Sequence, residues 1–521
     1  MQTGSMVRFA WFVVFLIQAG VTSGKEAGSS KRPNIVVIYA DDLGYGDIQC
    51  YNPNRGKILT PHVDRLASEG MRFTDGHSSS GCCSPSRYTL LTGRYHWRSK
   101  LQNGIVKLWE EALIKPERMT IASLAKKQGY RTACIGKWHL GWDWQISEDQ
   151  MELFVSPPKK RKVAVTEAQR AAWKEVFSKP IHGGPVELGF DRYFGTDVPN
   201  WPPFCYIEQN RTLGIPSEFL PQSLMVKNQA SKQGPALKGW TLEPILPALG
   251  ERSEKFIQSM ESESAPFLLY LSLTSPHTPL SVNEEWKGRS GLNLYADFVM
   301  ETDAIVGRVM AALRKSGQDK NTFVIFTSDN GCAKYIGTSE LEGKGHYPSG
   351  PLRGYKGDVW EGGHRVPFVV RWPEVVKSAS ECDQLVHQAD LMATFAEVMG
   401  VELPKNAGED SFSFLSLLKG GDGPVRQHAV SSAARGVPGV RWNQWKYILE
   451  PERGGDRKVG QLFNLANDLG ETMNLAAKEP ERVKEMETLF ERLIVRGRST
   501  PGPRQNNDVR VRRYLSESEK K

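Results

Sequence analysis

No stretch of the sequence beyond its first 24 residues is both long and apolar enough to cross a membrane, which takes about 20 apolar residues. The 521 residues are 39% hydrophobic and 24% charged, a composition that excludes an intrinsically disordered chain. The net charge of +8 is mild; it suits a protein that handles anionic substrates, and we expect no nucleic-acid partner. We therefore expect an ordinary globular protein, long enough for one large domain and a smaller one.

Cysteine is sparse, and its spacing excludes two classes of site. The sequence has no Cys-x-x-Cys pair and no cluster of cysteine with histidine, so neither a zinc site nor a dithiol redox motif is indicated. If one cysteine is chemically modified, six remain, an even number that permits disulfides without defining their pairing. The seven are Cys50, Cys82, Cys83, Cys134, Cys205, Cys332 and Cys382.

The N-terminus has the order of charges and apolar residues typical of a secretory signal peptide. Arg8 precedes an apolar run at 9–17, and small residues follow near 21–24. The run is too short for a membrane span, so we predict a signal peptide at 1–24 and an exported protein, periplasmic or secreted. A basic string at 157–163 resembles a nuclear-localisation signal, but behind a signal peptide we interpret it as a solvated loop.

Several apolar patterns predict an α/β fold. Continuously apolar, β-branched runs at 33–39, 266–273 and 321–328 are typical of strands buried on both faces of a parallel sheet. Apolar residues at helical spacing predict helices at 120–129 and 295–314. Parallel strands alternating with helices indicate a layered sheet covered by helices.

The character of the sequence changes at about residue 422. Two segments beyond it favour antiparallel strands, and a longer amphipathic segment with a proline at its start favours a helix. We therefore predict a smaller C-terminal domain. The predicted strands lie at 444–449 and 461–465 and the helix at 481–496, and the predicted divisions are an N-terminal domain at 32–421, a C-terminal α+β subdomain at 422–500 and a mobile tail at 501–521.

The stretch from Ser80 to Arg94 carries the strongest chemical signal. Cys83 is a nucleophile-type side chain at the predicted start of a helix, where free N–H groups and the helix dipole favour an anion. Arg87 and Arg94 are seven residues apart, which predicts that they share one helical face. The alternative interpretation of Cys82 and Cys83 is a buried or disulfide-bonded pair.

Acidic and amide side chains follow two of the predicted strands. Asp41 and Asp42 come directly after the first, and Asp329 and Asn330 come directly after another. Ligands gather beyond the carboxyl ends of strands in open α/β sheets. A pair of acids can also be a helix cap with a solvated neighbour, but two such strand ends favour oxygen ligands for a hard cation. Three carboxylates and one amide fit Ca²⁺ better than zinc, with Mg²⁺ the less favoured alternative.

The spacing Cys83-x-Pro85-x-Arg87 followed by Leu-Thr-Gly-Arg94 resembles the signature of the formylglycine-dependent sulfatases, an arylsulfatase family in the alkaline-phosphatase-like superfamily. The register selects Cys83, since from Cys82 the same offsets fall on serines. The resemblance implies that a formylglycine-generating maturation enzyme oxidises Cys83 to an aldehyde (3-oxoalanine). It also implies a calcium site formed by Asp41, Asp42, Cys83, Asp329 and Asn330.

Three further motifs match the same family. The resemblance implies that Lys137 and His139, in Gly-Lys-x-His-x-Gly, contact the aldehyde-derived group. It makes Lys356, in Lys-Gly-x-x-x-Glu-Gly-Gly-x-Arg-Val-Pro, a sulfate ligand. His277, after the strand at 266–273, is the candidate acid for the leaving alcohol.

The motifs extend the resemblance over residues 32–496, and it implies both fold and activity. The expected fold is a large mixed, mostly parallel sheet sandwiched by helices, with a smaller C-terminal antiparallel sheet plus helix. The expected activity is hydrolysis of sulfate monoesters by the catalytic domain at 32–421. A phosphodiesterase or phosphonate monoester hydrolase of the same superfamily is one alternative, and a non-catalytic glycan-binding protein is another.

Export, mild positive charge and a long aromatic insertion favour a sulfated carbohydrate as the substrate, although a sulfated small molecule also fits. The insertion at 143–262 contains Trp144 and Trp201, and Trp138 and Trp142 precede it closely. Aromatic side chains of this kind can line a sugar site. The alternative is that they pack the insertion itself.

Overall fold

The computed structural model describes residues 1, 2, 4, 32–157, 163–225, 232–450 and 460–512. Most of the predicted signal peptide and most of the basic string at 157–163 lie outside these residues. The chain from Arg32 onward forms one compact unit. The predicted division of this unit near residue 422 stays a prediction. Within the described ranges, no helix is long and apolar enough to span a bilayer.

A ten-stranded sheet forms the centre of this unit, and five neighbouring strands in its middle are parallel. Strands at both sides of these five add antiparallel pairs, so the sheet is mixed and mostly parallel, as predicted. In order across the sheet the strands are β13 (Ser380–Cys382), β2 (Met71–Phe73), β12 (Phe368–Arg371), β11 (Thr322–Ser328), β1 (Asn34–Ala40), β10 (Phe267–Ser272), β4 (Arg131–Lys137), β5 (Arg192–Thr196), β6 (Ile207–Glu208) and β7 (Arg211–Thr212).

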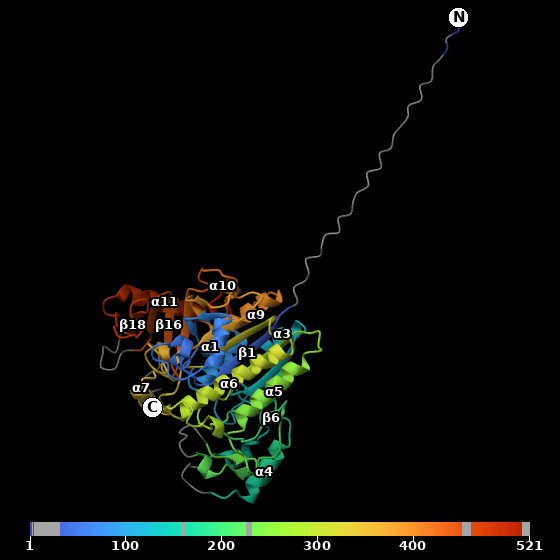
Figure 1. Cartoon of the computed structure of the whole chain (residues 1–521), viewed down its shortest axis with the longest axis vertical. Helices are drawn as coiled ribbons and strands as arrows, with labels where there is room; N and C mark the ends of the chain where they lie inside the picture. Colours follow the sequence, from blue (N-terminus) through green and yellow to red (C-terminus); the bar gives the residue numbers. More distant parts are fainter. Residues whose placement is uncertain (3, 5–31, 158–162, 226–231, 451–459, 513–521) are drawn as a thin grey trace. The chain divides into compact units, whose positions relative to one another are not determined.

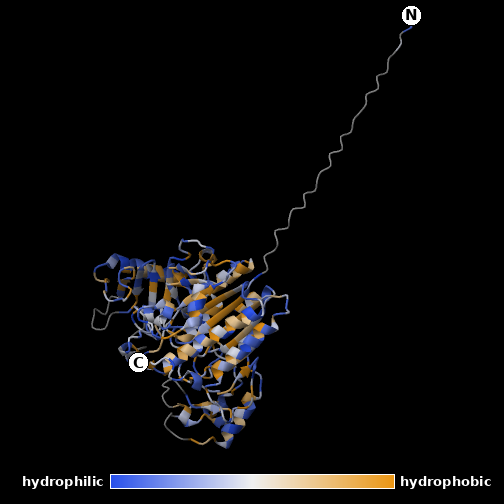
Figure 2. Ribbon diagram, viewed as in Figure 1, coloured by the Kyte–Doolittle hydropathy of each residue, from blue (hydrophilic) through white to orange (hydrophobic). Residues whose placement is uncertain are grey.

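The position of β1 in the centre of the sheet explains why residues 33–39 form a continuous apolar run. Val36 and Ile38 point into one hydrophobic core, and Ile35 and Val37 point into a second core on the opposite face. Both faces of the strand are therefore removed from water, and every inner position favours an apolar, β-branched side chain. Figure 2 shows the central strands as the most hydrophobic part of the fold.

Helices cover both faces of the sheet. Figure 1 shows α5 and α6 lying side by side on one of them. The helices of the first face are α1 (Pro61–Ser68), α5 (Ile245–Ser259) and α6 (Leu294–Lys315), and those of the second are α2 (Cys83–Thr92), α3 (Ile121–Lys127), α9 (Leu391–Met399) and α10 (Leu415–Leu418). The sandwich of helix, sheet and helix predicted from the sequence is confirmed.

The insertion after β4 is mostly irregular, as its sequence suggested. Its helix α4 (Glu167–Phe177) buries Trp173 in a small aromatic core, against which Trp109 and Trp144 pack. Trp144 therefore packs the insertion itself, whereas Trp138 and Trp142 are buried in the core on the second face of the sheet. Two short strands of the insertion, β8 (Glu218–Phe219) and β9 (Pro235–Ala236), pair with each other outside the large sheet. Outside the insertion lie the strand pair β3 (Gly76–His77) and β14 (Val386–His387) and the short helices α7 (Thr338–Gly343) and α8 (Glu361–His364).

The C-terminal part is a four-stranded antiparallel sheet with one long helix, as predicted. Its core includes Tyr95 and Trp97 from the segment after α2, which joins it to the larger part. Its elements are β15 (His428–Ser432), β16 (Pro438–Trp442), β17 (Trp445–Ile448), β18 (Gln461–Asn464) and α11 (Pro480–Arg496).

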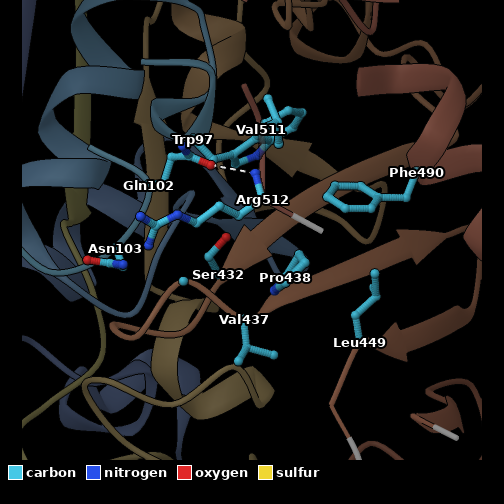
Figure 3. A pocket seen from close by; sticks show the side chains of 11 residues that line it. Trp97, Gln102, Asn103, Ser432, Val437, Pro438, Leu449, Phe490, Val511 and Arg512 are labelled. Carbon is cyan, nitrogen blue, oxygen red and sulfur yellow. Dashed lines mark hydrogen bonds between the residues drawn. The ribbon is translucent and has the colours of Figure 1, made fainter. Parts of the chain in front are cut away.

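Residues 501–512, the described part of the predicted C-terminal tail, contact the fold. Asp508 forms an ion pair with the buried Arg94 at 3.1 Å. The backbone N–H of Arg512 donates to the side chain of Gln102 at 2.6 Å, beside a pocket between the two parts of the fold (Figure 3). A short window of sequence does not show these long-range partners, and the mobility of the tail stays a prediction.

All seven cysteines lie within the described residues, and all are free thiols. The six cysteines that remain after modification of one therefore form no disulfide bonds in this structure. The disulfide interpretation of Cys82 and Cys83 is therefore wrong, although both side chains are buried.

Candidate active site

The central parallel strands place their carboxyl ends at one edge of the sheet, and the predicted site residues gather there. β1 ends before Asp41, β11 ends before Asp329, and Lys137 is the last residue of β4. Cys83 is the first residue of α2, so its side chain meets this edge at the N-terminus of a helix. Ligand atoms of Asp41, Cys83 and Asp329 lie within 4.8 Å of one another.

Acidic and amide oxygens around Cys83 form a buried group. Asp41, Asp42, Asp329 and Asn330 are all at most 1% exposed. The Asn330 amide nitrogen donates to Asp42 at 2.8 Å. Two oxygens, Asp41 Oδ1 and Asn330 Oδ1, accept no hydrogen bond from any described residue. Because buried oxygens without a partner are rare, this all-oxygen group fits a hard cation as an additional partner.

Each of the three carboxylates also contacts a basic side chain. Lys137 Nζ donates to Asp41 at 2.7 Å, and Lys356 Nζ donates to Asp42 at 2.7 Å. Arg87 donates to Asp329 at 2.7 Å and lies 3.5 Å from Asp41. Three basic groups are therefore paired with the carboxylates that lie around Cys83, an arrangement suited to binding an oxyanion.

Burial and neighbouring charges shift the pKa values of two acids in this group in opposite directions. Burial alone would raise the pKa of Asp41, but Lys137, His277 and Arg87 hold that pKa well below its usual value. Burial and the neighbouring charge of Asp41 raise the pKa of Asp329 well above its usual value. Two crowded carboxylates of this kind are stabilised when another positive charge is added.

The two predicted histidines present different nitrogen atoms to the site. His139 Nε2 lies 3.2 Å from the carbonyl of Val106, and since a carbonyl only accepts, this nitrogen carries the proton. His139 Nδ1 therefore holds a lone pair, and it has no hydrogen-bond partner among the described residues. Burial, with the charge of Lys137, lowers the pKa of His139 to about 3, so the ring is neutral.

His277 is oriented the other way round. Its Nδ1 donates to the carbonyl of Thr278, and its Nε2 lies 3.6 Å from Asp42. Burial, together with the charge of Lys356, lowers the pKa of His277 to about 4. Nε2 is therefore the atom through which this ring can exchange a proton with a bound molecule.

Backbone strain accompanies two of these positions. Asp42 has φ 63° and His139 has φ 55°, in the left-handed region that non-glycine residues seldom adopt. The backbone N–H of Asp42 donates to Asp329 at 3.0 Å, which helps to hold this conformation. Such strain is found where the surrounding structure directs a side chain toward a site.

The prediction that Arg87 and Arg94 share a helical face is wrong. α2 ends at Thr92, and Gly93 terminates it with φ 64°. Arg94 therefore leaves the helix and pairs with Glu409 at 3.3 Å, away from Cys83. The two arginines are seven residues apart, as a shared face requires, but the helix ends two residues before Arg94, so the helical spacing does not apply.

Sequence reasoning missed two residues that support the site. Ser272, the last residue of β10, accepts a hydrogen bond from Arg87 and donates to the carbonyl of Lys137 at 2.7 Å. Its position at the end of a buried strand was the available signal. Tyr295 donates to the carbonyl of Asp42 at 3.1 Å from α6, and nothing in its local sequence indicates that contact.

Two family models together match nearly all of the chain from residue 33 onward. The model described as Sulfatase matches residues 33–401, and the model described as N-sulphoglucosamine sulphohydrolase, C-terminal, matches residues 355–496. The overlap falls on the segment that carries Lys356 and α8. Both parts of the fold are therefore covered.

Individual proteins are similar over most of their length. An N-acetylgalactosamine-6-O-sulfatase of Bacteroides thetaiotaomicron is 32% identical over 500 residues, covering 90% of this chain and 94% of the relative. Human arylsulfatase A is 30% identical and covers 88% of this chain and 87% of its own. A structure from work on the metabolism of multiple glycosaminoglycans by Bacteroides thetaiotaomicron has a TM-score of 0.75 and 30% identity, covering 89% of this chain and 99% of that one.

Proposed function

The chain belongs to the sulfatase family of the alkaline-phosphatase-like superfamily and is a sulfuric ester hydrolase, and we propose that it is an exported enzyme that removes sulfate from a carbohydrate. The observation that carries this proposal is the position of Cys83. It begins a helix, and its sulfur lies within 4.8 Å of two strand-end carboxylates. These carboxylates and the neighbouring Asp42 are paired with three basic side chains.

The nucleophile in this proposal is the formylglycine made from Cys83. Its hydrate offers two hydroxyl groups on one carbon, one to attack sulfur and one whose loss of a proton lets the aldehyde form again as sulfate leaves. An unmodified thiol offers only one nucleophilic atom. Maturation by a formylglycine-generating enzyme is therefore part of the proposal.

The basic side chains bind and polarise the sulfate group. Arg87 presents a planar guanidinium, and Lys137 and Lys356 present ammonium groups that now contact carboxylates. All three reach the space around Cys83, so they can stabilise the charge that develops on the sulfuryl oxygens. Stabilisation of developing charge by groups already in place is usually the largest single contribution to such a transfer.

The two histidines transfer protons in this proposal. His139 Nδ1 carries the lone pair and is buried, so it is the base for the second hydroxyl at position 83. His277 Nε2 is the acid for the departing sugar alcohol, and an anionic ester beside it favours the protonated ring. A sugar alkoxide is a poor leaving group and needs that proton.

A divalent cation would be held by Asp41, Asp42, Asp329 and Asn330, together with the group at position 83. It would supply positive charge that acidifies a hydroxyl and offsets the crowding of the three carboxylates. The two oxygens without a hydrogen-bond partner, Asp41 Oδ1 and Asn330 Oδ1, support this proposal. An all-oxygen donor set favours Ca²⁺, with Mg²⁺ less favoured.

The substrate class rests on the relatives. One relative is named an N-acetylgalactosamine-6-O-sulfatase, and the similar structure cited above comes from work on the metabolism of multiple glycosaminoglycans. Export through the signal peptide predicted at 1–24 would place the enzyme where such polymers occur. Together these support a sulfated carbohydrate rather than a small aryl ester as the natural substrate.

The first test is the mass of the peptide that contains Cys83, from protein made in its native host. Conversion to formylglycine replaces sulfur with oxygen and removes two hydrogens, so the peptide becomes lighter. Oxidation to sulfenic, sulfinic or sulfonic acid adds oxygen and makes it heavier. A lighter peptide in an enzyme that releases sulfate supports the proposal. An intact thiol in protein that is fully active would overturn the assigned nucleophile.

A further inference from the structure

An aromatic side chain from the insertion lies directly beside the proposed catalytic base. The rings of Trp201 and His139 are 5.7 Å apart and inclined at 72°. β4 and β5 are parallel neighbours, so the segments that follow them emerge at the same edge of the sheet. Unlike Trp138 and Trp142, which are 1% exposed, Trp201 is only half-buried. Trp144 is also half-buried, but it packs against the aromatic core of the insertion. Trp201, beside His139, is therefore placed to meet a bound molecule.

A lysine from a separate segment covers this ring. Lys232 Nζ lies 4.4 Å from the centre of the Trp201 ring system, within the range of a cation–π contact. The backbone N–H of Lys232 donates to the carbonyl of Asn200 at 3.2 Å, which ties the two segments together. The ammonium group is therefore held at the ring by the fold as well as by its own flexible stem.

The same turn contains a buried polar group without a partner. Asn200 is 1% exposed, and its Oδ1 accepts no hydrogen bond from any described residue. An unsatisfied buried amide oxygen costs stability, and such groups are retained where a ligand or water supplies the donor. A sugar hydroxyl is a donor of the right kind.

We propose that Trp201, Lys232 and Asn200 form a subsite for an anionic sugar unit of the substrate. The apolar face of the sugar ring packs against Trp201, and Lys232 binds a carboxylate or second sulfate on that unit or its neighbour. A hydroxyl donates to Asn200 Oδ1. The inference rests on the proposed function, because it places this subsite beside the group that transfers sulfate.

This arrangement explains why the lysine lies over a half-buried ring. A lysine stem can stay on an apolar surface while its ammonium group reaches an anion. The ammonium group then discriminates between charged and neutral saccharides, because its attraction to a neutral sugar is weak. The ring contributes to binding of both.

The test compares the ratio of kcat/KM values for matched substrates. The substrates are three monosulfated disaccharides in which the neighbouring sugar is neutral, carries a carboxylate or carries a second sulfate, with an aryl sulfate as a fourth. The variants are Lys232→Ala, Trp201→Phe and Trp201→Ala, with Lys238→Ala as a control that removes an exposed lysine from the same segment. Each protein is first checked for formylglycine content.

We expect Lys232→Ala to reduce the preference for charged over neutral disaccharides by about tenfold, the effect of one partly exposed charge-assisted hydrogen bond. The charged disaccharide whose kcat/KM falls toward that of the neutral one identifies the anion that Lys232 binds as a carboxylate or a sulfate. Lys238→Ala should retain the wild-type ratios. Trp201→Ala should raise KM for all disaccharides relative to the aryl sulfate, a selective effect that a purely structural role would not predict. Trp201→Phe should restore part of the lost affinity.

Two contrary results differ in meaning. If wild-type enzyme cleaves the disaccharides and Lys232→Ala leaves the ratios unchanged, the subsite is refuted and the proposed function stands. If active wild-type enzyme cleaves the aryl sulfate but none of the disaccharides, both the carbohydrate substrate and the subsite are refuted.

Discussion

Lys446 Nζ lies 2.9 Å from a carboxylate oxygen of Glu361, and both side chains are 1% exposed. Lys446 belongs to β17 of the C-terminal sheet, whereas Glu361 begins α8, five residues after Lys356. The same ammonium group lies 2.8 Å from Glu471. The C-terminal sheet therefore braces the segment that carries one of the proposed sulfate ligands.

Replacing this lysine should impair both stability and sulfate binding. Lys446→Met leaves Glu361 and Glu471 buried without their partner, and removing one member of a buried ion pair costs about 3–5 kcal/mol. Loosening of the segment should also raise KM through Lys356. Urea unfolding and kinetics on an aryl sulfate measure both effects, with exposed Lys478→Met as the control. An unchanged KM in folded Lys446→Met would exclude a positioning role.

The two buried arginines of the signature should behave differently when replaced. Arg87→Lys loses the planar group that joins Asp329 to Ser272, and we expect kcat to fall by about 10²-fold or more, as when one preorganised donor is removed. Arg94→Lys changes an equally buried arginine that pairs outside the site, so it should lower stability and leave kcat near the wild-type value. Equal losses of kcat in the two variants would contradict this assignment of roles.

Removal of divalent cations should abolish activity and lower the melting temperature. Without a cation, the negative charges of Asp41, Asp42 and Asp329 repel one another in one buried space. A cation that binds only the folded state stabilises that state, so its removal lowers the melting temperature. Calcium should restore both properties more completely than magnesium. Activity and thermal unfolding after exhaustive chelation are the measurements. Full activity in metal-free protein would refute the cation proposal.

One stability effect is independent of the active site. Asp303 is 3% exposed and accepts backbone N–H groups of His62 and Val63, and burial raises its pKa to about 7. Because the folded pKa lies above the unfolded value, its contribution to stability is complete below about pH 4 and is lost as the pH rises toward 7.

Asp303→Asn should therefore flatten the dependence of unfolding free energy on pH between about 4 and 7, where one proton contributes at most about 1.4 kcal/mol per pH unit. Urea unfolding at several pH values measures the slope. Asp422→Asn, at an exposed position, is the control. The same slope in wild type and Asp303→Asn would show that Asp303 is ionised throughout.

The reaction preference separates the sulfatase from the phosphodiesterase alternative. We expect a higher kcat/KM for an aryl sulfate than for an aryl phosphodiester with the same leaving group, in keeping with the sulfatases among its relatives. The measurement requires protein whose position 83 is fully converted. Faster cleavage of the phosphodiester would overturn the proposed substrate class.

Local sequence was sufficient for the strands and for most of the proposed site. The runs that became β1 and β11 are buried on both faces, so their patterns are apolar throughout and their ends are marked by Asp41 and Asp329. Parallel pairing then brings those ends together without further information. The motif around Cys83 identified the remaining partners because its spacing resembles that of a known family.

Tertiary structure decided what depends on contacts between distant segments. Gly93 ends α2 and sends Arg94 to Glu409, Lys446 reaches Glu361 from another sheet, and Lys232 covers Trp201. These paired residues are too far apart in the sequence to follow the periodicity of one helix or strand, so no local pattern predicts the pairs. Sequence determined which elements form and where the chemical groups lie along them. Only the packing of those elements determined which charged side chains pair. A buried charge is stable only beside a partner of opposite charge, and that partner comes from a distant part of the chain.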